Sequence, residues 1–530
     1  MSDATAPART GPARKPLFSE GYKRAVLWIL TLVYTLNFID RTIVGIIGQP
    51  LKESLGITDN QLGLLTGFAF AILYTILGIP IARLAERFSR VDIMALCITI
   101  WSGFTALCGL APNFAAMLAC RVGVGIGEAG CSPPAHSLIS DYYEPRRRAS
   151  ALSIYAFGIP LGAMLGAVFG GVIAQYLNWR MAFFIVGVPG VMVAAALKLF
   201  VREPPRGHSE IEARPLLAED VTPEEVPGAA RRGAAAAFRH EISELWAVSR
   251  RIFGVWSFLN MALGITLASF AGYGAGQFAA PYFIRSFGLG LALVGVLFGT
   301  IGGVSTGAGT LLGGYLTDWA NRRSAAWYAL VPALGLSIAL PLYVLAYTRP
   351  DWRAAAWILL LPGIFHYTYL GPTFGVIQNA VDRRRRATAT ALLFFFLNLI
   401  ALGGGPPFTG WVIDRFAQFG FTHPGPHSML RALNLMVLHG QSAGRQFFEL
   451  CPGGVPSKAA PAALTAACRP ALARATREGL LVTFFFYGWG ALHYFLAAFT
   501  LSRDLKRAAA EQGVASPDRG AGAGSNIGRQ

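Results

Sequence analysis

Four ionisable side chains stand inside long apolar segments of the chain, where charge is costly. Asp40 and Arg41 lie in one such segment, and Arg121 and Glu128 lie in another. An ionisable residue at the centre of a membrane helix costs about 2.5–3.5 kcal/mol on insertion scales. Side chains of this kind should therefore face a cavity and pair with one another.

The positions of these four residues predict which pairs form. Glu128 lies about fourteen residues into its segment, near the middle of a bilayer, and Arg121 lies two turns earlier on the same face. The side chains of Asp40 and Arg41 diverge by about 100° because the residues are neighbours, so only one should point fully into an internal path. We expect Arg41 to pair with Glu128, and Asp40 to pair with Arg41 or Arg121.

These groups could bind a substrate and move protons, or they could only hold helices together. An arginine can hold an anionic head group, and a buried carboxyl group beside it can exchange a proton. The alternative is a set of fixed ion pairs that orders helix packing. Because buried ion pairs contribute little net stability, we favour the functional role.

The composition identifies the surroundings of these charges as a membrane. The chain has 530 residues, of which 54% are hydrophobic and only 14% are charged, whereas about 25% is usual in soluble domains. The net charge of +17 does not indicate nucleic-acid binding, because the basic residues form short clusters between apolar runs. Such clusters follow the positive-inside rule of membrane proteins.

Twelve apolar runs are long enough to cross a bilayer as helices, since a span needs about 20 residues. We therefore predict an all-α membrane protein. The expected spans cover residues 25–48, 61–83, 91–112, 114–138, 149–174, 181–201, 253–284, 291–316, 325–347, 354–379, 387–414 and 479–502.

The basic clusters also predict the orientation of the chain. They fall on alternate loops, and the same side receives both termini and the connector at 202–252, which places all three in the cytoplasm. We expect a multi-pass protein of the plasma membrane. The predicted parts are cytoplasmic tails at 1–24 and 503–530, six-helix bundles at 25–201 and 253–502, and a linker at 202–252 with a surface helix at 234–249.

Three pairs of segments reveal an internal repeat. "SLGITDNQLG" from Ser54 resembles "SFGLGLALVG" from Ser286, and "ARLAERFSRV" from Ala82 resembles "GYLTDWANRR" from Gly314. "RRRASA" from Arg146 resembles "RRRATA" from Arg384. Three matches in order, with nearly constant offset along the chain, indicate two parallel halves of six spans each.

The repeat relates Glu128 to a histidine in the second half, because the offset of the third pair of segments leads from Glu128 to His366. A histidine can change charge near neutral pH, so His366 either lines the path or is bonded to a nearby backbone group or hydroxyl. The second half otherwise offers Tyr273, Gln277 and aromatic runs in spans 11 and 12. Such runs more often serve packing or anchoring than ligand binding.

Two loops, between spans 2 and 3 and between spans 8 and 9, resemble the signature loop of the major facilitator superfamily. The residues that carry the resemblance are Gly78, Glu86, Arg87, Arg90, Gly314, Asp318, Arg322 and Arg323. Ala82 and Ser89 stand where glycine is usual, and Glu86 replaces an aspartate. The resemblance implies that these loops latch the two halves on the cytoplasmic side, and that spans 1, 4, 7 and 10 line the path.

A narrower resemblance is to the Spinster branch of this superfamily. It rests on "NFIDR" from Asn37 in span 1 and on "RVGVGIGEAGCSPPAHSLISDYY" from Arg121 in span 4. That branch includes transporters of lysophospholipids and sphingoid lipid phosphates. The broad resemblance covers nearly the whole chain, whereas the Spinster resemblance covers mainly the first half.

A long polar segment at 415–478 separates spans 11 and 12 on the outer side. It contains an amphipathic stretch and two cysteines, Cys451 and Cys468. Cysteines outside the cytoplasm tend to oxidise, so we predict a disulfide between them. We expect no metal or cofactor, and the sequence has no GxxxxGK[ST], HExxH or CxxC motif.

Together these features predict a monomeric secondary transporter that works by alternating access and moves an amphiphilic or lipid-like anion. Arg41 would hold the head group, the aromatic second half would hold the tail, and protonation of Glu128 would free Arg41 and couple a proton to the change of access. The alternatives are a carrier of small polar metabolites and a multidrug exporter. From other classes, the alternatives are a channel and a membrane-embedded enzyme.

Overall fold

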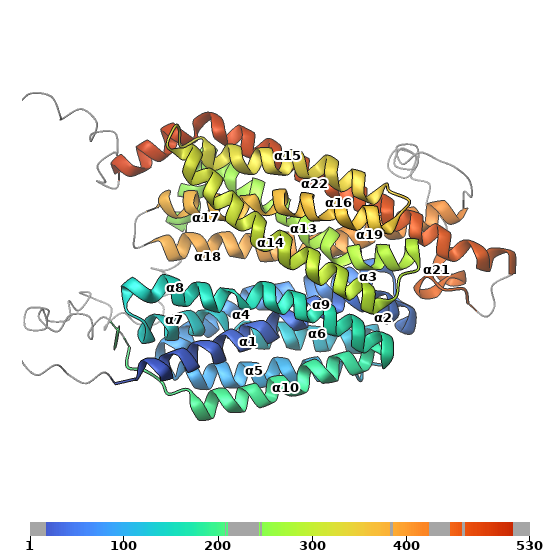
Figure 1. Cartoon of the computed structure of the whole chain (residues 1–530), viewed down its shortest axis with the longest axis horizontal. Coiled ribbons are helices and arrows are strands. Elements are labelled where there is room, and N and C mark those ends of the chain that lie inside the picture. The colour runs from blue at the N-terminus through green and yellow to red at the C-terminus, as the bar shows by residue number, and fades with distance from the viewer. Residues whose placement is uncertain are drawn as a thin grey trace, which may run out of the picture.

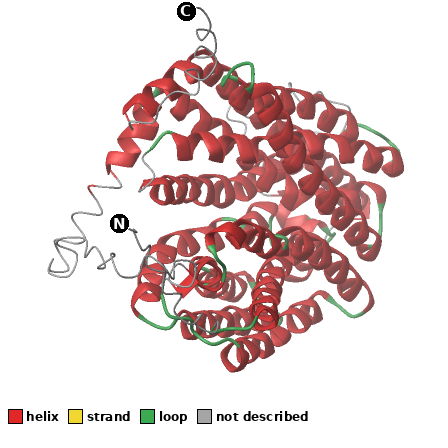
Figure 2. Ribbon diagram, turned by 60° about the vertical axis from the view of Figure 1, so that its left-hand side comes forward, coloured by secondary structure: helices red, strands yellow, loops and turns green. Residues whose placement is uncertain are grey.

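The computed structural model of the chain is built from helices. The structure describes residues 17–206, 208–209, 243, 246–381, 385–422, 446–457 and 462–511. Within these ranges there is no strand (Figure 2), and twelve helices are long and apolar enough to cross a membrane. The predicted all-α fold with twelve spans is confirmed.

Six spans, numbered in chain order, form the first half. Spans 1, 3 and 6 are the single helices α1 (Glu20–Ile46), α5 (Arg90–Cys108) and α10 (Trp179–Phe200). Spans 2, 4 and 5 each consist of two helical segments, which are α3 (Asp59–Thr66) with α4 (Phe68–Arg87), α6 (Phe114–Glu128) with α7 (Ser132–Tyr142), and α8 (Pro145–Ala156) with α9 (Gly158–Tyr176). The short helix α2 (Gly48–Leu55) connects spans 1 and 2.

The second half also has six spans, of which two are interrupted. Spans 7, 8, 9 and 12 are α13 (Trp256–Phe287), α14 (Leu291–Asn321), α15 (Trp327–Tyr347) and α22 (Ala462–Glu511). Spans 10 and 11 are interrupted and consist of α16 (Trp352–His366), η2 (Tyr367–Tyr369) and α17 (Leu370–Asn379), and of α18 (Arg386–Phe396), η4 (Leu397–Leu402) and α19 (Gly403–Thr422). Two short elements, α21 (Gln446–Leu450) and η5 (Pro452–Gly454), lie between spans 11 and 12.

The long loop predicted at 415–478 is shorter in the structure. α19 continues to Thr422, and α22 begins at Ala462. The prediction followed apolarity alone, whereas the residues that precede the apolar part of span 12 are mostly alanine, leucine, arginine and glutamate, which are strong helix formers. Span 12 therefore extends well beyond its apolar part.

Some predicted features fall on residues that the structure does not describe. They are most of the surface helix at 234–249, the amphipathic stretch of the long loop within 423–445, and the tails at 1–16 and 512–530. The inner parts of both predicted tails are described and are helical, because α1 begins at Glu20 and α22 ends at Glu511.

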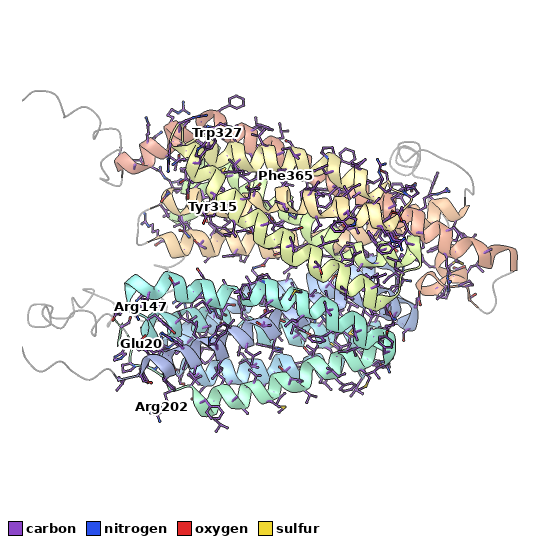
Figure 3. The ribbon with its side chains drawn as sticks, in the orientation of Figure 1. Glu20, Arg147, Arg202, Tyr315, Trp327 and Phe365 are labelled. Carbon is purple, nitrogen blue, oxygen red and sulfur yellow. A yellow bond between two sulfur atoms is a disulfide. The ribbon has the colours of Figure 1, made fainter. Side chains whose placement is uncertain are left out.

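The two halves lie side by side and have two distinct ends (Figure 1). We call proximal the end where α1 begins and α22 ends, and distal the opposite end, which holds α2, α3 and α21. Figure 3 places Glu20, Arg147 and Arg202 together towards the proximal end. There Arg147 Nη1 lies 3.2 Å from Glu20 Oε2 and joins span 5 to span 1.

Towards the distal end, the halves approach each other closely at two glycines that the repeat relates. A Cβ atom on Gly63 of α3 would lie 2.3 Å from the carbonyl oxygen of Pro406 in α19. Gly295 of α14 is its counterpart at the offset of the repeat, and a Cβ atom there would lie 2.3 Å from the carbonyl oxygen of Ala167 in α9. Backbone therefore packs directly on backbone at two places between the halves, where α3 meets α19 and where α9 meets α14.

We expect Gly295→Ala to weaken this interface, because the new methyl group would meet backbone atoms that cannot rotate away. Overpacking of this kind costs about 1–3 kcal/mol, so the apparent Tm of the purified protein in detergent should fall. Gly302→Ala is the matched control, since Gly302 lies in the same helix with open space around its Cβ position. Equal Tm values for the two variants would contradict this prediction.

Candidate functional site

The charges of the first half meet at an interruption in span 4. α6 ends at Glu128, and the chain resumes as α7 at Ser132, with prolines at positions 133 and 134. A proline lacks the backbone N–H that would continue the helical ladder. Broken helices in transporters commonly mark binding sites, and here the break follows directly after the acidic residue.

Arg41 and Glu128 form an ion pair at this break. Arg41 Nε donates to Glu128 Oε2 at 2.7 Å, and the carboxyl group is fully buried, whereas the Arg41 side chain is 22% exposed. The guanidinium carbon also lies over the rings of Phe38, Phe70 and Tyr74, at 5.2, 4.7 and 4.8 Å from the ring centroids. Arg41 is therefore held on one side by an acid and aromatic faces, while another part of it remains accessible.

Asp40 forms a second pair, deeper in the first half. Its two carboxylate oxygens accept from Thr105 Oγ1 at 3.0 Å and from Arg121 Nη1 at 3.1 Å. Arg121 Nε also donates to the carbonyl oxygen of Leu65 at 3.4 Å. Asp40 and Arg121 are 0% and 2% exposed. This pair therefore lies deeper in the first half than Arg41, whose side chain is partly exposed.

His366 occupies the equivalent break in span 10, because α16 ends at this residue just as α6 ends at Glu128. The ring is buried, and its Nδ1 atom lies 3.3 Å from the hydroxyl groups of both Tyr343 and Tyr487. Its Nε2 atom has no hydrogen-bond partner among the described residues and faces the backbone of Gly272. The structure therefore places His366 among tyrosines of the second half.

Tyr273 and Gln277 project from α13 towards the first half. Tyr273 is 44% exposed and lies close enough to Arg41 for an electrostatic interaction. Gln277 is buried, and its amide group packs on α1 and α2 at the positions of Gly45 and Gly48. Tyr273 therefore lies within electrostatic range of Arg41, and Gln277 helps to join the halves on the distal side of it.

The residues of the two signature loops make their described contacts within their own halves. Arg90 donates to Glu203 Oε1 at 2.6 Å and lies 2.5 Å from Asp141 Oδ2; Asp141 belongs to α7, and Glu203 lies three residues after the end of α10. Arg323 lies over the ring of Trp319, one turn earlier in the chain. Among the other residues of the two loops, Arg87, Asp318 and Arg322 are exposed, and Gly78 and Gly314 are partly buried. The side chain of Glu86 lies outside the described part of the structure.

A buried charge cluster at the distal end was missed by sequence reasoning. Lys52 Nζ and Arg285 Nη2 each lie 2.6 Å from an oxygen of Asp59. Asp414 accepts from the backbone N–H groups of Asp59 and Asn60 at 3.0 and 2.8 Å. Burial lowers the pKa of Lys52, although Asp59 beside it acts in the opposite direction.

These distal charges stand at or beyond the ends of the predicted spans, where charged residues normally face water. They join two helices of the first half to two of the second, since Lys52 and Asp59 belong to α2 and α3, and Arg285 and Asp414 to α13 and α19. The topology predicts that all four residues lie at the same end of the fold, and this was the one signal that could have found the cluster. The sequence does not show that other residues cover them there and bury them.

One match to the GxSxG pattern of serine hydrolases exists, at residues 303–307. It lies inside helix α14 rather than at a turn between a strand and a helix. Ser305 is buried and donates to the carbonyl oxygen of Leu360 at 3.2 Å. The described residues also hold no group of three or more side chains suited to a metal ion.

Comparisons with known proteins place this geometry among transporters. Residues 30–406 match the model of the Major Facilitator Superfamily. The chain is 30% identical to an MFS-type efflux pump of Mycolicibacterium smegmatis, over 79% of this chain and 90% of that protein. It is 26% identical to the sphingosine-1-phosphate transporter SPNS2 of Xenopus tropicalis, over 76% of this chain and 77% of that protein.

Among solved structures, the chain is similar to a bacterial homologue of the human lysosomal transporter Spinster, captured in an inward-facing and unoccupied conformation. The TM-score is 0.74 and the identity is 34%, and the match covers 92% of this chain and 99% of that one. The broken spans and the paired charges described above thus belong to a fold shared over nearly the whole chain.

We expect Asp40→Asn to destabilise the protein strongly, because it leaves the Arg121 guanidinium buried without its acid. Removing one partner of a buried pair costs about 3–5 kcal/mol. The measurement is the apparent Tm and the yield of folded protein, in a double-mutant cycle with Arg121→Gln. The double variant should recover part of the loss, and additive losses would show that the two charges act independently.

Proposed function

The chain belongs to the Major Facilitator Superfamily and is a transporter of the Spinster type, and we propose that it carries an amphiphilic, anionic small molecule by alternating access, linked to protons. The observation that carries this proposal is the state of Arg41. Its side chain is partly exposed, yet its guanidinium is held beside a fully buried carboxyl group and three aromatic rings. A cation in such a place can exchange one anionic partner for another.

Glu128 would be the group that takes up the proton. One of its oxygens is bound to Arg41, while Oε1 is buried and has no hydrogen-bond partner within the described chain. A proton on this carboxyl group removes the charge that holds Arg41. Arg41 would then be free to bind an anionic head group, and loss of the proton would restore the ion pair and expel the anion.

An apolar pocket in the second half suits the tail of such a molecule. It lies between α13 and the segments α18 and η4, with a cavity volume of about 330 Å³. The residues that line it are Ile252, Phe253, Leu259, Ala262, Leu263, Thr266, Leu392, Leu393, Phe396 and Ile400. Since Tyr273 on the same helix α13 lies within electrostatic range of Arg41, one amphiphile could place its head on the first half and its tail on the second.

Two independent features support an orientation with the proximal end in the cytoplasm. The arginine-rich loops lie at that end, in agreement with the positive-inside rule. The disulfide between Cys451 and Cys468 lies beyond the distal end of the spans, and disulfides persist where the surroundings are oxidising. The distal end would then face the outside of a bacterial inner membrane, and the protein would act as a monomer.

In this orientation the structure corresponds to an inward-facing state. The halves are joined distally by the contacts of Gly63 and Gly295, while the described contacts of Arg90 and Arg323 stay within their own halves. We propose that the signature loops latch the halves proximally in the opposite state. The distal contacts would then separate and admit or release substrate on the outer side.

Transport by purified protein in vesicles, screened with lysolipids, amphiphilic drugs and small polar anions at two pH values, tests this function. We expect Glu128→Gln to abolish the response to a proton gradient and Arg41→Ala to reduce uptake of the anionic amphiphile by about 100-fold. Glu20→Gln, which changes an exposed acid on the same helix as Arg41, should transport like the parent.

Several outcomes would argue against the proposal. If both site variants transport like the parent, the charge network is structural. Uptake restricted to small polar anions would replace the amphiphile with a polar metabolite, and uptake of uncharged or cationic drugs alone would favour a multidrug exporter. Flux that neither saturates nor responds to substrate on the opposite side would indicate a channel.

The tail pocket gives a separate prediction. Ala262→Phe should fill the pocket and raise KM for a long-chain anionic amphiphile about tenfold, because several buried methylene groups would lose their contacts. The KM for a short-chain analogue with the same head group should change little. An equal change for both chain lengths would show that the variant disturbs the protein rather than the tail site.

A further inference from the structure

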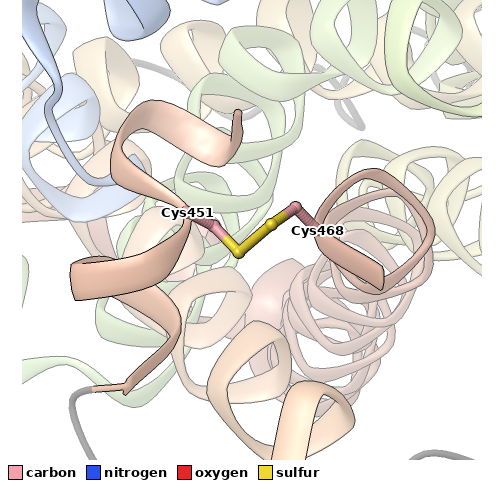
Figure 4. Close-up of a disulfide and its surroundings, with 2 residues drawn as sticks. All are labelled: Cys451 and Cys468. Atoms are coloured by element: carbon pink, nitrogen blue, oxygen red, sulfur yellow. A yellow bond between two sulfur atoms is a disulfide. The ribbon is translucent and has the colours of Figure 1, made fainter. Parts of the chain in front are cut away.

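The segment between spans 11 and 12 forms a compact cap on the second half. It consists of residues 446–457, and it is joined to α22 by the disulfide between Cys451 and Cys468 (Figure 4). Both cysteines are fully buried. The ring of Phe447 packs against that of Phe421 at the end of α19, with 5.6 Å between centroids, so the cap is fixed to two helices of the second half.

This cap reaches across to the first half and rests on α2. Gly453 has a positive φ of +67°, and a Cβ atom there would lie 2.8 Å from the carbonyl oxygen of Lys52 and 2.9 Å from the Cα atom of Glu53. Pro452 lies near Gly56, where α2 ends. The cap therefore touches the backbone of α2 at the residue whose side chain belongs to the buried distal charge cluster.

The charge cluster below the cap also joins the two halves. Arg285 of the second half binds Asp59 through both terminal nitrogens, and its Nε atom donates to Gln49 Oε1 of α2 at 2.6 Å. Thr476 of α22 accepts from Arg285 Nη1 at 2.8 Å. The helix that carries the disulfide thus also contributes to the cluster.

We propose that the disulfide-bonded cap and this charge cluster act as one strap that holds the distal end closed, and that the disulfide determines how readily the distal end opens. The proposal rests on the alternating access proposed above. Separation of the halves must lift the cap from α2 and part Arg285 and Asp414 from Asp59. Each half then keeps one cation and one anion, so no net charge is stranded when the strap opens.

The disulfide matters because it fixes the segment that makes the contact. Without it, residues 446–457 would be held to α22 only by the chain and by packing such as that of Gly454 on Leu472, and positioning Gly453 against α2 would cost more conformational entropy. The closed distal state would lose stability relative to the open one. The strap would thus make the inward-facing state the resting state of the transporter.

A distance measurement between the distal ends of the two halves tests the strap. Spin labels would be attached at Leu110→Cys in the first half and Arg349→Cys in the second, both at exposed positions, in protein whose free cysteines Cys97, Cys108, Cys120 and Cys131 are replaced by alanine. Pulsed electron resonance in vesicles then reports the populations of short and long distances. No substrate needs to be known.

Gly453→Ala is the informative variant, and Gly288→Ala is its matched control. Both glycines have nearly the same positive φ, +67° and +65°, but a Cβ atom at Gly288 would meet nothing within 4 Å. The backbone strain is therefore equal, and only Gly453→Ala presses the cap away from α2. We expect the ratio of long to short distances to rise about tenfold for Gly453→Ala and to stay within about twofold of the parent for Gly288→Ala.

A second variant addresses the disulfide itself. Cys451→Ser with Cys468→Ser should raise the same ratio at least as much as Gly453→Ala, with the apparent Tm recorded to show that the protein is folded. If the parent shows both distances and the cap variants have the same ratio of long to short distances as the parent, the strap proposal is wrong, whereas alternating access still holds. A parent and variants that never show the long distance would overturn both.

Discussion

The cost of placing charge in hydrocarbon governs the arrangement of this molecule. The four charges in the interior of the first half are paired with one another, and the pairs lie where helices break or meet. Asp40 and Arg121 bind each other and are completed by Thr105 and the carbonyl group of Leu65. Arg41 and Glu128 instead leave one carboxylate oxygen without a partner among the described residues and part of the Arg41 side chain exposed. This difference in hydrogen bonding is why we propose the Arg41–Glu128 pair as the functional one and the Asp40–Arg121 pair as its support.

The repeat in the sequence has a counterpart in the geometry of the backbone. Span 4 breaks after Glu128 and span 10 breaks after His366, although the two residues have different surroundings. Gly63 and Gly295 occupy matched contacts between the halves. The two halves therefore share the break in spans 4 and 10 and the glycine contacts, while the side chains at the break differ: Glu128 is paired with an arginine, and His366 lies among tyrosines.

The number of spans, their order and the pairs Arg41–Glu128 and Asp40–Arg121 could be predicted because apolarity and helical spacing act locally. The distal cluster of Lys52, Asp59, Arg285 and Asp414 could not, because each of these residues looks like an ordinary charge at the end of a span. Their burial depends on a cap formed much later in the chain. The extent of span 12 was also misjudged, since helix propensity continues where apolarity stops.

α22 spans 50 residues, or about 75 Å at 1.5 Å per residue, which is more than twice the thickness of a hydrocarbon core of about 30 Å. One end carries Cys468, and the other carries Glu511, which pairs with Arg251 just before span 7 at 2.7 Å. Pro470 lies two residues after Cys468, and a proline interrupts the hydrogen-bond ladder of a helix. One continuous helix therefore connects the disulfide at the distal end with an ion pair at the proximal end, with a point of bending close to the disulfide.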